Sequence, residues 1–86
     1  MAAYHLMGIL IGKRRENAVK VQDILTRHGC IIKVRLGLHD AGDACSDEGL
    51  TVLQLDGPQE EIDDLYADLN VVDGVSAEMI ELGGAG

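Results

Sequence analysis

Residues 4–39, "YHLMGILIGKRRENAVKVQDILTRHGCIIKVRLGLH", contain three successive patterns that decide the fold. Residues 4–12 are almost continuously apolar, which is typical of a central strand covered on both faces. Residues 15–29 place apolar side chains at helical spacing, which predicts a helix with one buried side. Residues 30–39 alternate apolar and polar side chains, which predicts a half-buried strand. The stretch therefore predicts a strand, a helix and a second strand.

The remaining sequence predicts a second set of elements. "LTVLQLD" (50–56) favours a third strand, "GPQEEIDDLYADLN" (57–70) has the apolar spacing of a helix, and "VSAEMIEL" (75–82) favours a fourth strand. The order β-α-β-β-α-β is that of the ferredoxin-like α+β fold. Right-handed crossovers would place both helices on one face of a four-stranded antiparallel sheet with strand order 4-1-3-2.

Length and charge narrow the classes of protein. A chain of 86 residues is long enough for one core, so we expect a single domain over residues 1–82 and a flexible tail over residues 83–86. The net charge of −8 repels phosphate backbones and argues against direct nucleic-acid binding. No apolar run is long enough to span a membrane, and two cysteines are too few for a disulfide framework. Cytoplasmic localisation is the expectation.

The alternation in the strands also predicts which side chains leave the core. In the second strand, Ile32, Val34, Leu36 and Leu38 are expected under the helices, with Lys33, Arg35 and Gly37 facing outward. On the other strands the expected outward residues are Leu6, Gly8, Leu10, Leu50, Val52, Gln54, Glu78 and Ile80. The outward face would then be apolar in its middle. Because a monomer seldom leaves such a patch in water, we expect a homodimer or a tetramer.

A metal site is one interpretation of the histidines and cysteines. His28 and Cys30 begin the second strand and His39 ends it, roughly 25–30 Å away at about 3.3 Å per residue, so they cannot share one ion with Cys45. A smaller set of His39, Asp40, Asp43 and Cys45 is geometrically compatible with a metal, but a solvated hairpin loop is favoured. We expect Cys30 to be a small buried apolar residue. The sequence predicts no metal and no cofactor.

The candidate binding residues lie around the start of the first helix. Three basic residues there combine with free helix N–H groups and the helix dipole, a setting that suits an anion. The alternative is that these basic residues only balance the acidic hairpin at the same end of the sheet, which contains Asp40, Asp43, Asp47 and Glu48. Asn17 is the expected N-cap. The candidate ligand-binding residues are Gly12, Lys13, Arg14, Arg15, Asn17 and, as a neighbour, His39.

Nothing in the sequence assembles a catalytic set. The topology brings together no Ser-His-Asp or Cys-His arrangement, and no phosphate-binding GxxxxGK[ST] motif is present. The carboxylate runs "QEEIDD" and "SDE" are typical of solvated faces. We therefore expect a protein without enzymatic activity.

Nearly the whole chain, from Tyr4 to about Leu82, resembles a family of small proteins described as regulators of the iron-only hydrogenase system. The similarity is most distinctive at "GILI", at "REN" before the first helix, and at "GCIIKVRLGLH". The resemblance implies an ACT-like domain, similar to the ligand-sensing domain of the nickel-responsive repressor. Such domains oligomerise and often bind a small ligand between subunits.

The resemblance implies a regulatory role, and an effect on transcription would need a partner protein or an unexpected DNA contact. Together with the basic residues before the first helix, it leads us to expect a domain that senses a small anionic ligand at a subunit interface. The alternative is an adaptor module that binds proteins without a ligand. "GKRREN" lacks the Pro and Gly of amino-acid-binding ACT domains, and the chain has no His-x-His pair of the nickel sensors. Neither an amino acid nor nickel is therefore carried over as the ligand.

Overall fold

The computed structural model describes residues 3–38 and 47–83 of the chain. Strand β4 includes Gly83, one residue more than predicted, and residues 84–86 of the predicted tail lie outside the described residues. Within the described part, no helix is long and apolar enough to cross a membrane. The elements are β1 (Ala3–Ile11), α1 (Arg14–Arg27), a 3-10 turn η1 (Gly29–Ile31), β2 (Ile32–Leu38), β3 (Gly49–Leu55), α2 (Gln59–Asn70) and β4 (Val75–Gly83).

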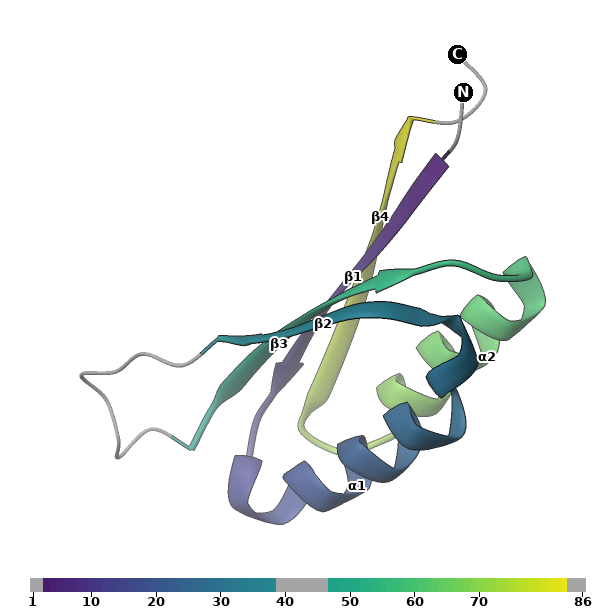
Figure 1. Ribbon diagram of the computed structural model, residues 1–86. Helices are drawn as coiled ribbons and strands as arrows, with labels where there is room; N and C mark the ends of the chain where they lie inside the picture. The colour runs from purple at the N-terminus through teal and green to yellow at the C-terminus, as the bar shows by residue number, and fades with distance from the viewer. Residues whose placement is uncertain (1–2, 39–46, 84–86) are drawn as a thin grey trace.

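The described strands form one antiparallel sheet in the order β2-β3-β1-β4. Read from the other edge, this is the predicted order 4-1-3-2, and the ferredoxin-like βαββαβ fold is confirmed. Both helices lie on the same face of the sheet, and β1 and β4 pair along their whole length and project together beyond the helices (Figure 1).

The core lies between the helices and the sheet. Strands β1 and β3 alternate buried and less buried side chains, because successive residues of a strand point to opposite faces. The helices add aliphatic residues at three- and four-residue spacing. The buried apolar residues are Met7, Ile9, Ile11, Val21, Ile24, Leu25, Ile31, Leu53, Leu55, Ile62, Leu65, Leu69, Val75 and Ala77.

The predicted faces of β2 are wrong beyond its first residue. Arg35 pairs with the buried Leu53, so Arg35 lies on the helix side of the sheet, whereas Leu36 pairs with Val52 on the opposite side. The cause is an irregularity in register between Ile32 and Val34, where one extra residue inverts the alternation that follows. Ile32 packs against the core as predicted. Arg35 thus joins α1 on the helix side instead of facing outward.

The side of the sheet away from the helices is called the open face below. On β1, β3 and β4 the predicted outward residues do lie there, because their sequence neighbours fill the core. Val34 and Leu36 of β2 are added to it by the inversion. Apolar side chains at least 42% exposed on this face are Tyr4, Leu10, Val34, Leu36, Leu50, Ile80 and Leu82.

Candidate functional site

The predicted binding residues lie where the end of β1, the start of α1, the residues before β3 and the turn between α2 and β4 meet. We call Gly12, Lys13, Arg14, Arg15 and Asn17 the rim. The backbone N–H of Gly12 donates to the carbonyl of Gly74 at 2.7 Å, and that of Arg14 donates to the carbonyl of Asp47 at 2.9 Å. The end of β1 and the chain that follows the β2 hairpin therefore share one end of the sheet, as the topology predicted.

Asn17 is the buried centre of the rim and not the N-cap that was predicted. Helix α1 begins at Arg14, and its N-cap is Lys13, whose φ of 50° is left-handed. Asn17 is only 2% exposed. Its Nδ2 donates to the carbonyls of Gly12 and Asp73, both at 2.8 Å. This one amide joins the β1–α1 connection to the turn before β4. Its two hydrogen bonds explain how a polar residue is accommodated on the buried side of the helix.

Gly12 of the rim and Gly74, in the turn before β4, permit a close backbone approach. A Cβ atom on Gly12 would lie 2.8 Å from the carbonyl oxygen of Gly74, a distance at which the backbone must shift. Gly74 itself has a φ of 87°, which favours glycine. Gly12 therefore has a structural reason to be glycine that is independent of any ligand.

Asp47 caps the N-terminus of α1. Its carbonyl accepts the N–H of Arg14, and its carboxylate Oδ1 accepts the N–H of Arg15 at 2.9 Å. A carboxylate at this position satisfies helix N–H groups and opposes the positive end of the helix dipole. Of the amides that the sequence offered to an external anion, that of Arg14 is thus bound to the carbonyl and that of Arg15 to the carboxylate of Asp47, and an external anion at this point would have to displace Asp47.

Lys13 and Asp73 form a salt bridge across the rim, with Nζ 3.0 Å from Oδ2. The hydrogen bond to Asp73 and its charge raise the pKa of Lys13, and the hydrogen bond and charge of Lys13 lower the pKa of Asp73. Both side chains are well exposed. Water and salt screen such a pair, so its contribution to stability is small.

The side chains of Arg14 and Arg15 differ in setting. Arg14 lies against Gly49, since a Cβ atom there would be 3.1 Å from the Arg14 Cδ. Arg15 is exposed. His39 and the acidic residues Asp40 and Asp43 lie outside the described residues. The binding role of the rim residues and His39 stays a prediction.

His28 and Cys30 lie at the other end of α1. His28 Nε2 is 2.8 Å from Asp68 Oδ2 of α2, which joins the two helices. Cys30 is a free, exposed thiol in the turn η1, so its predicted burial is wrong. The next residue, Ile31, is buried in the core instead. Among residues 3–38 and 47–83, no three His, Cys, Asp or Glu side chains are grouped to hold a metal. The smaller set that includes Cys45 lies outside those ranges.

Sequence reasoning missed the roles of Asp47, Asp73 and Gly74. "DG" at 73–74 is a turn signal that identifies the position of the turn. No local signal shows that the carbonyl of Asp73 accepts a hydrogen bond from Asn17, 56 positions away in the sequence. Asp47 was counted only as one of the acidic residues facing the basic ones.

On the open face, apolar residues occupy adjoining cross-strand rows. Leu10 pairs with Leu50, and Leu36 pairs with Val52 across β2 and β3. Leu6 pairs with Ile80, and beyond them Tyr4 pairs with Leu82 on the projecting part of β1 and β4. Side chains opposite one another in antiparallel strands lie close together, and Gly8, Gln54 and Glu78 lie among these apolar pairs on the same face.

The fold defines the class as a small ferredoxin-like α+β domain, and solved structures share that fold. The uncharacterized protein TM1266 from Thermotoga maritima is similar with a TM-score of 0.81 and 18% identity, over 95% of this chain and 100% of that one. CPII from Thiomonas intermedia K12 is a nitrogen regulatory PII-like protein, and its structure bound to ADP, AMP and bicarbonate is also similar. The TM-score is 0.60 with 16% identity, over 96% of this chain and 93% of that one.

The apo form of CPII is similar as well, with a TM-score of 0.52 and 16% identity, over 98% of this chain and 96% of that one. At these identities the likeness concerns the fold. No protein-family model matches the sequence, and no curated protein is significantly similar to it.

Proposed function

We propose that the protein is a cytoplasmic, non-enzymatic regulatory domain that assembles through its open face and senses a small anionic molecule. The observation that carries the proposal is the open face itself. Seven large apolar side chains on this face are at least 42% exposed. Soluble monomers rarely expose continuous apolar patches above about 300–600 Å². A second copy of the chain fits this apolar surface, because in a two-fold interface the same surface supplies both sides.

The sensing part of the proposal has separate support. CPII shares the fold and is described as a regulatory protein bound to ADP, AMP and bicarbonate, which are anions. Three of the seven basic residues of this acidic chain lie together at the rim. A thermal-shift screen with phosphate, bicarbonate, AMP, ADP, amino acids and divalent metals tests it. Stabilisation by an anion that disappears when Arg14 and Arg15 are replaced by Ala supports a rim site; stabilisation that persists in this variant contradicts it.

Assembly is tested by placing a charge in the middle of the open face. Leu10→Glu should convert the oligomer into a monomer in sedimentation velocity at micromolar concentration, because a carboxylate buried without a partner is costly. Val19→Glu is the matched control: it makes the same chemical change on α1, at a side chain 69% exposed on the other side of the sheet. A wild-type chain that sediments as a stable monomer would contradict the proposal.

The second candidate is a ligand-free adaptor module. The observation in its favour is that Asp47 already occupies the N–H groups at the start of α1. An adaptor would bind its partner protein through the same open face and show no shift with any ligand of the screen. A shift with one of the anions would exclude it.

The regulated system proposed is that of the iron-only hydrogenase, with transcription affected through a partner protein. Its support is the resemblance at "GILI", "REN" and "GCIIKVRLGLH". Deletion of the gene in its host should change the amount of hydrogenase transcript, and complementation with the Leu10→Glu variant should not restore it. Unchanged transcript after deletion would contradict this part of the proposal.

A further inference from the structure

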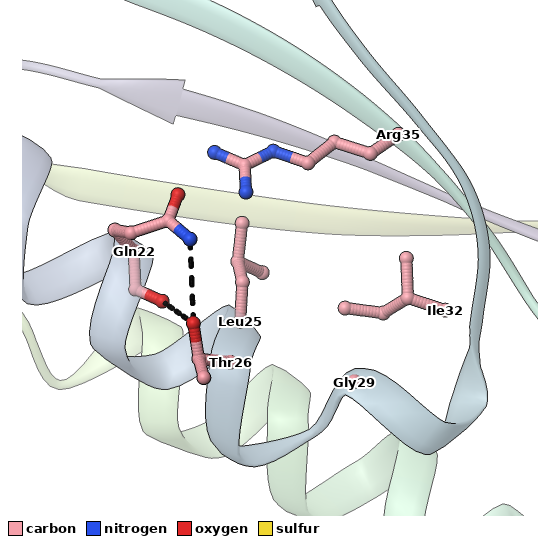
Figure 2. Close-up of a pocket in the computed structure, with 6 residues that line it drawn as sticks. All are labelled: Gln22, Leu25, Thr26, Gly29, Ile32 and Arg35. Carbon is pink, nitrogen blue, oxygen red and sulfur yellow. Dashed lines mark hydrogen bonds between the residues drawn. The ribbon is translucent and has the colours of Figure 1, made fainter.

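The inverted edge strand creates a groove that the sequence did not predict. Two hollows lie between α1 and β2, and Arg35 lines both. The first has a volume of about 230 Å³ and is lined by Gln22, Leu25, Thr26, Gly29, Ile32 and Arg35 (Figure 2). The second, of about 180 Å³, lies nearer the rim and includes Arg14 and Val21.

The groove exists because β2 offers little volume to fill it. The bulge after Ile32 turns Val34 and Leu36 to the open face and leaves Arg35 and Gly37 on the helix side. Gly37 has no side chain, and a Cβ atom there would have no neighbour within 4 Å. Leu25 and Ile32 supply an apolar lining, with Ile32 packed only partly against the core. An edge strand with aliphatic residues on this side would have closed the gap.

Arg35 is the charged group of the groove. Figure 2 shows its guanidinium extending across the hollow, over Leu25 and towards Gln22. Gln22 and Thr26 are hydrogen-bonded to each other, with Nε2 donating to Oγ1 at 3.3 Å and Oγ1 donating to the Gln22 carbonyl at 2.9 Å. Within residues 3–38 and 47–83, no hydrogen bond or ion pair is found for the Arg35 guanidinium, although the chain has 15 acidic residues.

A guanidinium that has no partner among the described residues and lies beside an apolar hollow favours a particular ligand chemistry. The planar fork of an arginine binds a carboxylate through two parallel hydrogen bonds. The apolar lining favours a hydrocarbon group next to that carboxylate, and burial of that group adds affinity. A hollow of about 230 Å³ matches a small molecule in size.

We propose that the first hollow binds a small monocarboxylate, with the carboxylate on Arg35 and the hydrocarbon part against Leu25 and Ile32. The proposal rests on the proposed function in that it names a ligand class for the sensing domain, but it places the ligand in the groove and not at the rim. Binding here leaves the hydrogen bonds from the N–H groups of Arg14 and Arg15 to Asp47 intact.

The test is a titration of the full chain with benzoate, followed by two-dimensional amide NMR. Saturable shifts are expected at residues 22–26 and 32–37. Benzamide, which has the same shape without the charge, should cause no saturable shift. Inorganic phosphate should bind more weakly than benzoate, since it makes no use of the apolar lining. Equal responses to benzoate and phosphate, or none at the groove, would overturn the proposal.

Variants locate the site. Arg35→Gln should weaken benzoate binding at least about tenfold, the loss expected for charge-assisted hydrogen bonds. Arg35→Lys keeps the charge without the fork and should also weaken it, so the test stands if one variant does not fold. Lys20→Gln, which makes the same change of charge on an exposed position of α1, should bind as the wild type does. Equal affinity for benzoate in Arg35→Gln and Lys20→Gln would refute the assignment.

Steric variants distinguish the two hollows. Gly29 and Gly37 both have room for a Cβ atom, and neither has a positive φ. Gly29→Leu should fill the first hollow and prevent binding, whereas Gly37→Leu should leave benzoate affinity within about threefold of wild type. The opposite result would move the ligand out of the first hollow and contradict the proposal. Sedimentation of the same samples reports assembly separately, so a failure of the benzoate assignment can be distinguished from a failure of the proposed assembly.

Discussion

The rim and the open face differ in whether their side chains have partners within the same chain. At the rim, Asn17, Asp47 and Asp73 are hydrogen-bonded to other parts of the same chain. On the open face, large apolar side chains are exposed to solvent. Of the residues that suggested a binding site from the sequence, Gly12, Lys13 and Asn17 thus make contacts within the domain, whereas the face with no recognisable motif is the one for which we propose a partner. A cluster of polar residues is therefore explained first by hydrogen bonds between distant parts of the chain, and only then by a ligand.

The largest effect is expected from breaking the rim at its buried centre. Asn17→Asp removes the donor that binds the carbonyls of Gly12 and Asp73 and places a carboxylate against two carbonyl oxygens. We expect a loss of about 3 kcal/mol or more in the free energy of unfolding, because two buried acceptors lose their partner. Urea denaturation measures it, with Glu16→Gln, an exposed neighbour, as the control. A loss below about 1 kcal/mol would show that the rim does not depend on Asn17.

A smaller effect is expected from shortening one apolar side chain of the open face. Leu36 is 53% exposed, so its covering in a dimer is worth about 1 kcal/mol per protomer. Leu36→Ala changes both copies in a two-fold interface and should raise the dissociation constant about 30-fold in sedimentation equilibrium, with little change in the fold. Val71→Ala, at a side chain 82% exposed outside the open face, is the control. Equal dissociation constants for both variants would contradict an interface at Leu36.

Removing the carboxylate of Asp47 tests whether the rim can accept an external anion at all. Asp47→Ala should cost about 1 kcal/mol in stability through loss of the helix cap. The vacated N–H of Arg15 should then make the variant respond to phosphate, with a larger rise in melting temperature than the wild type shows. Glu60→Ala in the first turn of α2 serves as the control. Equal phosphate responses in Asp47→Ala and wild type would show that Asp47 does not block an anion.

The smallest effect concerns the exposed pair of Lys13 and Asp73, and it depends on pH. Since folding lowers the pKa of Asp73 below its ordinary 3.8, the stabilisation is present above about that pH and is lost as the pH falls through the folded value. Asp73→Asn should therefore be slightly less stable than wild type at pH 6 and equal to it near pH 2. A difference between Asp73→Asn and wild type that is the same at both pH values would assign the effect to something other than the ion pair.

The sequence predicted the element order, the strand order and the meeting of the β1–α1 connection with the hairpin. It could do so because hydrophobic periodicity and the handedness of crossovers leave few topologies. It did not predict the faces of β2, since one extra residue at the bulge inverts Val34, Arg35 and Leu36 without altering their alternation. Asn17 was placed at the helix start because its residue type is common there, while its burial was not visible locally.

The sequence by itself therefore determined the fold and the apolar character of β1, β3 and β4, because those depend on the order and period of side chains along the chain. The tertiary structure alone decided that Asp47 caps α1, that Asn17 joins two distant turns, and that Arg35 faces α1 across a hollow. These are contacts between residues far apart in the chain or consequences of a single shift in register. Neither leaves a periodic trace in the sequence, because each is fixed only when the strands and helices pack.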